Sequence, residues 1–243
     1  APIGNFLGAE NVGRFTASMV PGERPWWFFG PVLLGDLFPW APLVLVPLIY
    51  GWRPRQSGEG ATQADLRRLC WLWIVVIVAA FTASATKQDL YIFPVMPAAA
   101  VLIADAITNW LQGGRERLVR GLLVTVSGLT VLLGAGIGWT FGSGVYALAG
   151  TGFAAVALVG GGAAALVLLA RDRRAGAIGA LAAGFIGFNY VFVARILPDA
   201  ERFKPIPAIA RVVTERAGAG ARLGAFGTML PSLVFYAGRP VEE

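Results

Sequence analysis

The sequence has 243 residues, of which 56% are hydrophobic and 14% are charged, and its mean hydropathy is +0.66. A soluble domain of this length could not bury so much apolar surface, because most of its exterior would have to be polar. The formal net charge is +6. The arginines cluster between apolar stretches, so we attribute this charge to membrane orientation and expect no nucleic-acid partner.

The chain has no histidine and a single cysteine, Cys70, within an apolar run. Histidine is the commonest metal ligand and general base, so its absence removes the usual choice for both roles. One cysteine forms neither an intrachain disulfide nor a zinc-ligand spacing. No metal site is predicted. The chain begins at Ala1 without a signal-peptide pattern, and we expect it to start partway through a longer protein.

Six stretches approach or exceed the ~20 apolar residues that cross a bilayer. In chain order, the predicted spans are Trp27–Tyr50, Leu69–Ala85, Leu90–Leu111, Gly121–Thr140, Val145–Ala170 and Gly176–Leu197. These stretches predict an all-α polytopic membrane protein with about six transmembrane helices, and they place the transmembrane region at residues 27–197.

The first predicted span contains Asp36, which precedes a proline-rich turn at residues 39–42. That turn favours a bend that would bring Asp36 to water at the outer face, and an ionisable group near a span is a natural functional candidate. The alternative is a carboxylate that local backbone groups satisfy. Both interpretations remain open from the sequence.

The loops between spans differ sharply in charge. The short loops at one side carry only Lys87, whereas the opposite loops carry ten arginines: Arg53, Arg55, Arg67, Arg68, Arg115, Arg117, Arg120, Arg171, Arg173 and Arg174. The positive-inside rule assigns the arginine-rich side to the cytoplasm. We therefore expect both termini of this segment to be extracytoplasmic.

Glycines recur in the later spans. Gly134, Gly138 and Gly142 have the small-xxx-small spacing that lets helices approach closely. We interpret this spacing as packing within the helix bundle rather than as a dimer face.

Two segments flank the predicted membrane region. Residues 1–26 form a juxtamembrane segment, which we expect to be extracytoplasmic. Residues 198–243 predict the start of a small, truncated extracytoplasmic α/β domain, with a helix at Pro205–Ala217, a strand at Leu223–Phe226 and a helix or second strand at Pro231–Tyr236.

The outer loop between the second and third spans predicts a phosphate site. It forms a tight hairpin from Ser84 into a span with prolines at Pro94 and Pro97, which we expect to bend the helix. Lys87 is the only cation in this loop, and the hydroxyl of Tyr91 follows four residues later. An ammonium beside a hydroxyl is suited to holding a lipid phosphate, although surface lysines near headgroups are also common.

Several short motifs occur in an order that resembles a known family. They are Glu10-Asn11-Val12-Gly13-Arg14-Phe15, Pro25-Trp26-Trp27-Phe28-Phe29, Leu37-Phe38-Pro39-Trp40, Ser84 through Pro97, Pro231 through Tyr236, and Gly238-Arg239. Together they resemble the middle and C-terminal portion of bacterial polyprenyl-phosphate-dependent glycosyltransferases of the GT-C class. Lipid A aminoarabinose transferases and protein O-mannosyltransferases are similar enzymes.

The resemblance implies an enzyme of the bacterial inner (cytoplasmic) membrane. Such an enzyme moves a sugar, with inversion, from a polyprenyl-phosphate carrier to a lipid A, protein or glycan acceptor at the outer face. Its partners are the carrier-linked sugar and the lipid or protein acceptor. The family's catalytic base is an aspartate in an early outer loop, which nothing in this sequence matches, so we expect that base to lie outside these residues.

The resemblance also assigns roles to individual residues. Lys87 and Tyr91 match the family's lysine and tyrosine beside the carrier phosphate, and Arg14 matches an arginine that could hold phosphate or shape the acceptor cleft. Glu10 and Asn11, with Asp36, are candidates for the acceptor cleft. Asn11 stands where the family often has a metal-binding histidine, and asparagine is a poor ligand for transition metals. A divalent metal in the full-length protein therefore stays an open question.

Two other classes of function remain as alternatives. A secondary transporter or lipid flippase fragment would place ionisable or unwound sites near the membrane midplane, commonly within internal repeats. We find no clear repeat, and only Asp36 comes near a midplane position. A non-catalytic membrane module that binds a partner through its outer segments is the second alternative.

Overall fold

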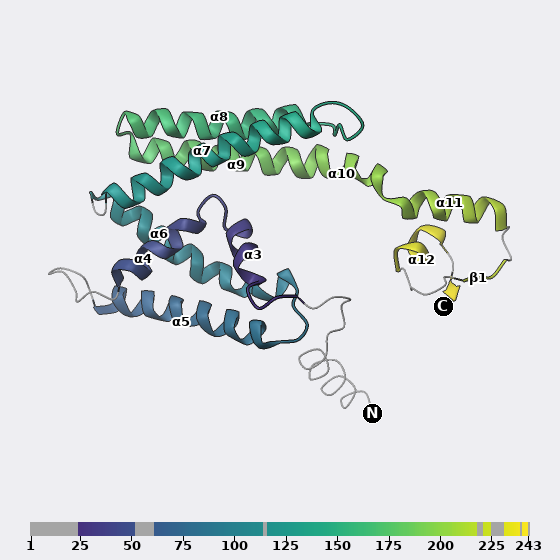
Figure 1. The fold of residues 1–243 in the computed structure, drawn as a ribbon, viewed down its shortest axis with the longest axis horizontal. Helices are drawn as coiled ribbons and strands as arrows, with labels where there is room; N and C mark the ends of the chain where they lie inside the picture. The colour runs from purple at the N-terminus through teal and green to yellow at the C-terminus, as the bar shows by residue number, and fades with distance from the viewer. Residues whose placement is uncertain are drawn as a thin grey trace. The chain divides into compact units, whose positions relative to one another are not determined.

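The structure is a computed structural model that describes residues 24–51, 61–113, 116–217, 221–224, 231–238 and 240–242 (Figure 1). By contacts, the chain divides into two units. Unit 1 comprises Ala1–Val131 and Gly161–Ala182, and unit 2 comprises Leu132–Gly160 and Ala183–Glu243. Glu10, Asn11 and Arg14 lie outside the described residues.

The first predicted span is two helices, α3 (Phe29–Asp36) and α4 (Ala41–Gly51), whose axes differ by 104°. The intervening segment contains a cis peptide bond between Phe38 and Pro39. Proline lacks a backbone N–H and disfavours helix in the residue before it, which explains the break. The bend expected at the proline-rich turn is confirmed.

Helices α5 (Ala61–Ala83) and α6 (Met96–Leu111) pack against each other, and α4 packs against both. The helix of the second predicted span begins before Leu69, so Arg67 and Arg68 lie within α5 rather than in the loop before it. A helix can begin before its apolar stretch, and hydropathy alone does not register the polar first turns.

We expected the prolines of the third predicted span to bend its helix, but they do not kink an α-helix. Pro94 lies in a 3₁₀ helix, η2 (Asp89–Val95), and Pro97 lies in the first turn of α6. First-turn N–H groups have no partner within a helix, so a proline there costs no hydrogen bond. The prolines therefore shape the entry to the span and leave α6 regular.

The remaining apolar helices are α7 (Glu116–Phe141), α8 (Thr151–Ala170) and α9 (Arg174–Val191). The last continues through a π-helical turn, η3 (Phe192–Ile196), into α10 (Leu197–Ala200) and a short 3₁₀ turn, η4 (Glu201–Phe203). Within the described residues, five helices are long and apolar enough to cross a membrane, or six if α3 and α4 form one broken span. The predicted all-α polytopic architecture is confirmed.

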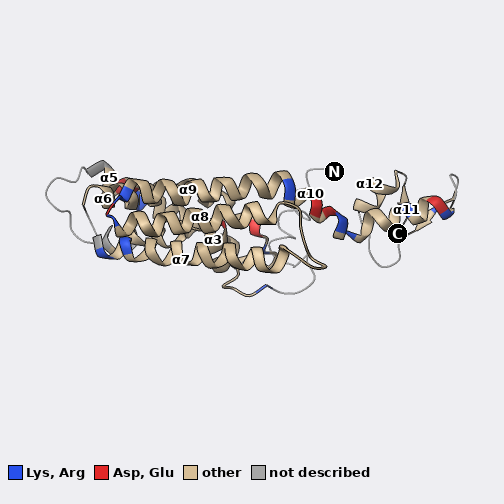
Figure 2. Cartoon of the chain, turned by 90° about the horizontal axis from the view of Figure 1, so that it is seen from above, with Lys and Arg blue, Asp and Glu red and all other residues tan. Residues whose placement is uncertain are grey.

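Arginines near the starts of α5, α7 and α9 lie at one end of the helices of unit 1. Figure 2 shows a group of lysine and arginine positions at that end, and further ones near α10 and α11. The contacts there are Arg67 Nε to Asp105 Oδ2 at 3.0 Å, Arg120 Nη2 to the Leu169 carbonyl at 3.0 Å, and Arg174 Nη1 to the Trp110 carbonyl at 2.8 Å. Side chains from the starts of α5, α7 and α9 thus hold the ends of α6 and α8.

The glycine spacing of α7 serves helix packing within unit 2. A Cβ on Gly134 would lie 2.8 Å from Leu158 Cβ, and one on Gly138 would lie 3.1 Å from Ala155 Cβ. Both neighbours belong to α8. The expectation that these glycines pack within the bundle is confirmed for Gly134 and Gly138, whereas Gly142 follows the end of α7 and a Cβ there would meet only Gly138 of α7.

The C-terminal part of unit 2 contains α11 (Pro205–Ala217), β1 (Leu223–Gly224), α12 (Pro231–Ala237) and β2 (Val241–Glu242). The two strands are parallel, with Leu223 opposite Val241, and α11 packs against α12. The helix predicted at Pro205–Ala217 is confirmed, and the segment at Pro231 is a helix rather than a strand. The domain limits at residues 26 and 197 remain a prediction.

Candidate functional site

The hairpin between α5 and η2 is closed by its own polar groups. Ser84 Oγ donates to the carbonyl of Thr86 at 3.1 Å, and Lys87 Nζ donates to the carbonyl of Ser84 at 2.8 Å. Ser84 and Thr86 are buried, with 4% and 2% of their surfaces exposed. Because buried polar groups are stable only when they are hydrogen-bonded, these contacts fix the backbone that carries Lys87.

Lys87 is half-buried and keeps spare donors. An ammonium group carries three N–H donors, and one of them serves the Ser84 carbonyl. Within the described residues, Lys87 forms no salt bridge, although Asp89 begins η2 two residues later. The remaining donors can therefore receive an anionic group such as phosphate.

Tyr91 lies in η2 and is held by its ring. The ring centroid is 5.0 Å from that of Phe81 near the end of α5, and the Tyr91 N–H donates to the Gln88 carbonyl at 3.2 Å. The hydroxyl has no hydrogen-bond partner in the part of the chain that the structure describes. A fixed ring with an unused hydroxyl is a suitable second donor next to a lysine.

An apolar groove of about 650 Å³ runs between α3 and α5. Its walls are Trp26, Trp27, Phe29, Gly30, Leu33, Ile74, Val75, Val78, Ala79, Thr82 and Ala83. The groove reaches Ala83, the residue immediately before Ser84 of the hairpin. The walls come from α3, α5 and the segment that precedes α3.

Asp36 is the last residue of α3 and is exposed. It makes no hydrogen bond or salt bridge to any described residue, so the structure does not support the alternative of a carboxylate satisfied by local backbone. Helix α3 packs against η2, the element that carries Tyr91. Its role in an acceptor cleft remains a prediction.

The described residues contain no group of three or more His, Cys, Asp or Glu side chains that could hold a metal ion. Glu10 and Asn11, the pair that resembles the family's metal motif, are not among them. We therefore derive no chemical step that depends on a metal.

Sequence reasoning missed two features of this site. Trp26 and Trp27, which precede α3, line the groove, and the guanidinium of Arg24 lies 4.5 Å from the ring centroid of Phe28. The small residues Gly30 and Ala83 were the available signal, because facing small residues leave space between helices.

Solved structures define the class of fold. The crystal structure of ArnT from Cupriavidus metallidurans bound to undecaprenyl phosphate aligns with a TM-score of 0.60 and 19% identity over 98% of this chain and 42% of that chain. Its apo structure aligns with a TM-score of 0.55 and 21% identity over 92% and 41%. The fold is therefore that of a polytopic membrane protein and is similar to the fold of ArnT over the aligned residues.

Curated relatives give the particular resemblance. An undecaprenyl phosphate-alpha-4-amino-4-deoxy-L-arabinose arabinosyl transferase of Pseudomonas fluorescens is 30% identical over 130 residues, which cover 53% of this chain and 22% of the relative. Transferases with the same name are 30% identical over 127 residues in Pseudomonas aeruginosa and 31% identical over 128 residues in Sodalis glossinidius. No family model matches the chain.

These similarities confirm the resemblance to lipid-carrier glycosyltransferases that the sequence motifs indicated. The aligned region spans about a fifth of the length of the curated relatives, at 22% of each of the three named above. The activity of a whole enzyme is consequently a proposal for this chain.

Proposed function

We propose that this chain is the C-terminal portion of a membrane glycosyltransferase. The enzyme moves a sugar from a polyprenyl-phosphate carrier to a lipid A, protein or glycan acceptor at the outer face of the bacterial cytoplasmic membrane. The observation that carries the proposal is the apolar groove between α3 and α5, which reaches the hairpin that bears Lys87 and Tyr91. A polyprenyl phosphate has the same combination of a long apolar chain and an anionic head.

The chemistry of the transfer suits these residues. The departing polyprenyl phosphate gains negative charge as the bond between sugar and oxygen breaks. A cation held beside it stabilises the transition state more than the ground state, and this difference accelerates the reaction. The hydrogen bond from Lys87 to Ser84 positions the ammonium in advance, so little reorganisation is needed when charge develops.

Arg14 is proposed as a further contact to the carrier phosphate or the acceptor cleft, and Glu10, Asn11 and Asp36 as residues of that cleft. The catalytic aspartate is expected in a part of the enzyme outside this sequence. We propose residues 1–26 and 198–243 as extracytoplasmic segments on either side of the membrane region at 27–197, with both ends of the segment outside.

The transporter alternative is less well supported than the enzyme. Transporter sites lie near the membrane midplane, where discontinuous helices bind the substrate. The break between α3 and α4 fits such a site, and Asp36 lies at it. Elsewhere in the described spans, the salt bridges and the cations without a salt-bridge partner lie towards the ends of the helices.

A photo-crosslinking experiment tests the carrier site. A polyprenyl-phosphate probe should label peptides around Lys87, and unlabelled polyprenyl phosphate should compete. Lys87→Ala should reduce labelling about tenfold, because a charge-assisted hydrogen bond contributes about 1.5–3 kcal/mol. Lys204→Ala, the same change at an exposed lysine after the last span, should leave labelling unchanged.

Both variants must first show the far-ultraviolet circular dichroism and the single elution peak of the parent. Equal labelling of folded Lys87→Ala and parent would contradict the enzyme proposal. Ion-coupled uptake of a solute by vesicles that contain the chain would support the transporter instead.

A further inference from the structure

Arg195 lies in the π-helical turn η3, at the end of α9. Among the described residues it forms neither a hydrogen bond nor a salt bridge. Single π-helical turns within α-helices frequently mark functional sites, because the extra residue changes the direction of the side chains that follow. Arg195 is exposed, so its guanidinium is available to an anionic partner.

The loop before α8 lies close against the turn that carries Arg195. Gly150 has a φ of +89°, and a Cβ there would lie 2.7 Å from Arg195 Cβ and 3.2 Å from Val191 Cγ1. Only glycine tolerates both this backbone conformation and this close approach. Gly150 therefore allows the start of α8 to approach the turn that carries Arg195.

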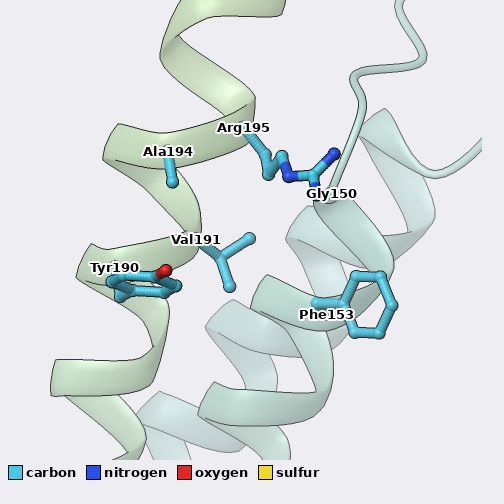
Figure 3. A pocket seen from close by; sticks show the side chains of 6 residues that line it. All are labelled: Gly150, Phe153, Tyr190, Val191, Ala194 and Arg195. Atoms are coloured by element: carbon cyan, nitrogen blue, oxygen red, sulfur yellow. The ribbon is translucent and has the colours of Figure 1, made fainter.

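A pocket of about 260 Å³ opens beside Arg195. It is lined by Gly150, Phe153, Tyr190, Val191, Ala194 and Arg195. Figure 3 shows the Arg195 side chain extending from η3 towards Gly150, with Tyr190 on α9 and Phe153 on α8. At about 30 Å³ per water molecule, this volume holds roughly nine waters, which is room for a phosphate group.

The electrostatics of the pocket favour an anion. Helix α8 begins at Thr151, and the N–H groups of Gly152 and Phe153 in its first turn donate to no described acceptor. Such free N–H groups carry the positive end of the helix dipole. Two sources of positive potential, the helix end and the guanidinium of Arg195, therefore meet at one pocket.

The nearby carboxylates already have partners. Asp199 Oδ2 accepts the Ala149 N–H at 2.8 Å and lies 3.4 Å from Arg202 Nη2. Glu201 Oε1 accepts from Lys204 Nζ at 2.5 Å. Neither carboxylate lies within salt-bridge distance of Arg195, so the positive charge of the pocket is not neutralised by the described residues of unit 2.

The surface around the pocket is apolar. Phe153 and Tyr190 are each 76% exposed, and Val156 and Ile186 on the same two helices are each 71% exposed. Both helices belong to candidate membrane spans. A ligand that places an anion in the pocket and hydrocarbon on this surface is a lipid rather than a soluble phosphate ester.

We propose that Arg195 and the start of α8 bind the phosphate headgroup of an anionic membrane lipid, with its acyl or isoprenoid chains on the exposed apolar surface of α8 and α9. This site belongs to unit 2, whereas the Lys87 hairpin belongs to unit 1. The inference does not depend on the proposed glycosyltransferase activity.

Native mass spectrometry of the full chain in detergent micelles tests the proposal. Phosphatidylglycerol should bind, diacylglycerol with the same chains should bind at least tenfold more weakly, and Arg195→Gln should weaken phosphatidylglycerol binding about tenfold. That factor corresponds to about 1.4 kcal/mol, the scale of one hydrogen bond to a charged group. Arg195→Lys keeps the charge and should lose less affinity.

Arg211→Gln is the matched control. It makes the same change at an exposed arginine of α11, outside the spans, and should not alter binding. Equal phosphatidylglycerol binding by folded Arg195→Gln and Arg211→Gln would overturn the proposal, as would equal binding of diacylglycerol. Competition by millimolar inorganic phosphate would identify the ligand as free phosphate and overturn the lipid source.

Discussion

Asp105 lies on α6, where its side chain is 9% exposed and its Oδ2 atom is 3.0 Å from Arg67 Nε on α5. This contact is not aligned as a hydrogen bond, so the attraction is that of an ion pair. Gln63 Nε2 and Asn109 Nδ2 donate to the other carboxylate oxygen at 3.3 and 3.2 Å. Polar groups on two helices thus fix the register of α5 against α6.

Replacing only one of Arg67 and Asp105 should destabilise the fold more than replacing both with apolar residues. Removing one member of a buried ion pair leaves an uncompensated charge and typically costs about 3–5 kcal/mol, whereas replacing both with apolar residues can be neutral. Arg67→Met or Asp105→Leu alone should therefore lower the free energy of unfolding by about 3 kcal/mol. The double variant should recover most of that loss when unfolding is measured in mixed micelles.

An exposed pair on the same helix provides the control. Arg68 and Asp65 lie 3.4 Å apart, and their side chains are 76% and 69% exposed. Solvent screening makes such a pair worth about 0–1 kcal/mol, so Arg68→Met should change stability little. Losses at Arg67 and Asp105 that simply add in the double variant would show that the two charges act independently.

At the scale of elements, hydropathy and capping patterns located the helices but not their irregular turns. The helix Pro205–Ala217 has the predicted limits because proline begins it and a glycine-rich stretch follows it. The π-helical turn η3 carries no proline or glycine to announce it. Pro198 follows two residues later and cannot donate to the Ala194 carbonyl, which was the local signal for an irregular turn here.

The candidate site likewise has one part that the sequence predicted and one part that it did not. Lys87 and Tyr91 are four residues apart in one hairpin, so their proximity follows from the sequence, and the Ser84 carbonyl adds the contact that holds Lys87. The groove that reaches them arises where α3 meets α5, through side chains far apart in the chain. Such a surface depends on tertiary packing, which neither the hydropathy pattern nor the proline positions specified.

The close approach of α7 and α8 in unit 2 gives a test at this scale. A Cβ on Gly134 would lie 2.8 Å from Leu158 Cβ and 3.0 Å from the Val159 backbone nitrogen, so the helices would have to separate. Overpacking of this kind costs about 1–3 kcal/mol. Gly134→Ala should lower stability in mixed micelles by an amount in this range.

Gly136 lies on the same helix, and a Cβ there would meet nothing within 4 Å. Gly136→Ala should be neutral or slightly stabilising, since alanine favours helix over glycine by about 1 kcal/mol. If both variants behaved alike, α7 and α8 would not be in close contact at Gly134.

At the scale of the whole molecule, the distribution of charge and the packing of the helices predict the same orientation in the membrane. Arg67, Arg120 and Arg174 contact groups at the ends of α6 and α8, so these three arginines lie together at one end of unit 1. The Lys87 hairpin joins the other ends of α5 and the η2–α6 segment. The positive-inside rule then predicts that the hairpin faces outward and that the basic end faces the cytoplasm.

Cysteine accessibility tests this orientation, and the chain suits the method because Cys70 is its only cysteine and is buried. In a Cys70→Ser background, Asp89→Cys should react with a membrane-impermeant maleimide in intact bacterial spheroplasts. Asp172→Cys, in the exposed turn between α8 and α9, should react only after permeabilisation. Labelling in the reverse order would place the hairpin in the cytosol. Lys87 and Tyr91 could not then meet a carrier phosphate at the outer face, and the proposed glycosyltransferase orientation would be wrong.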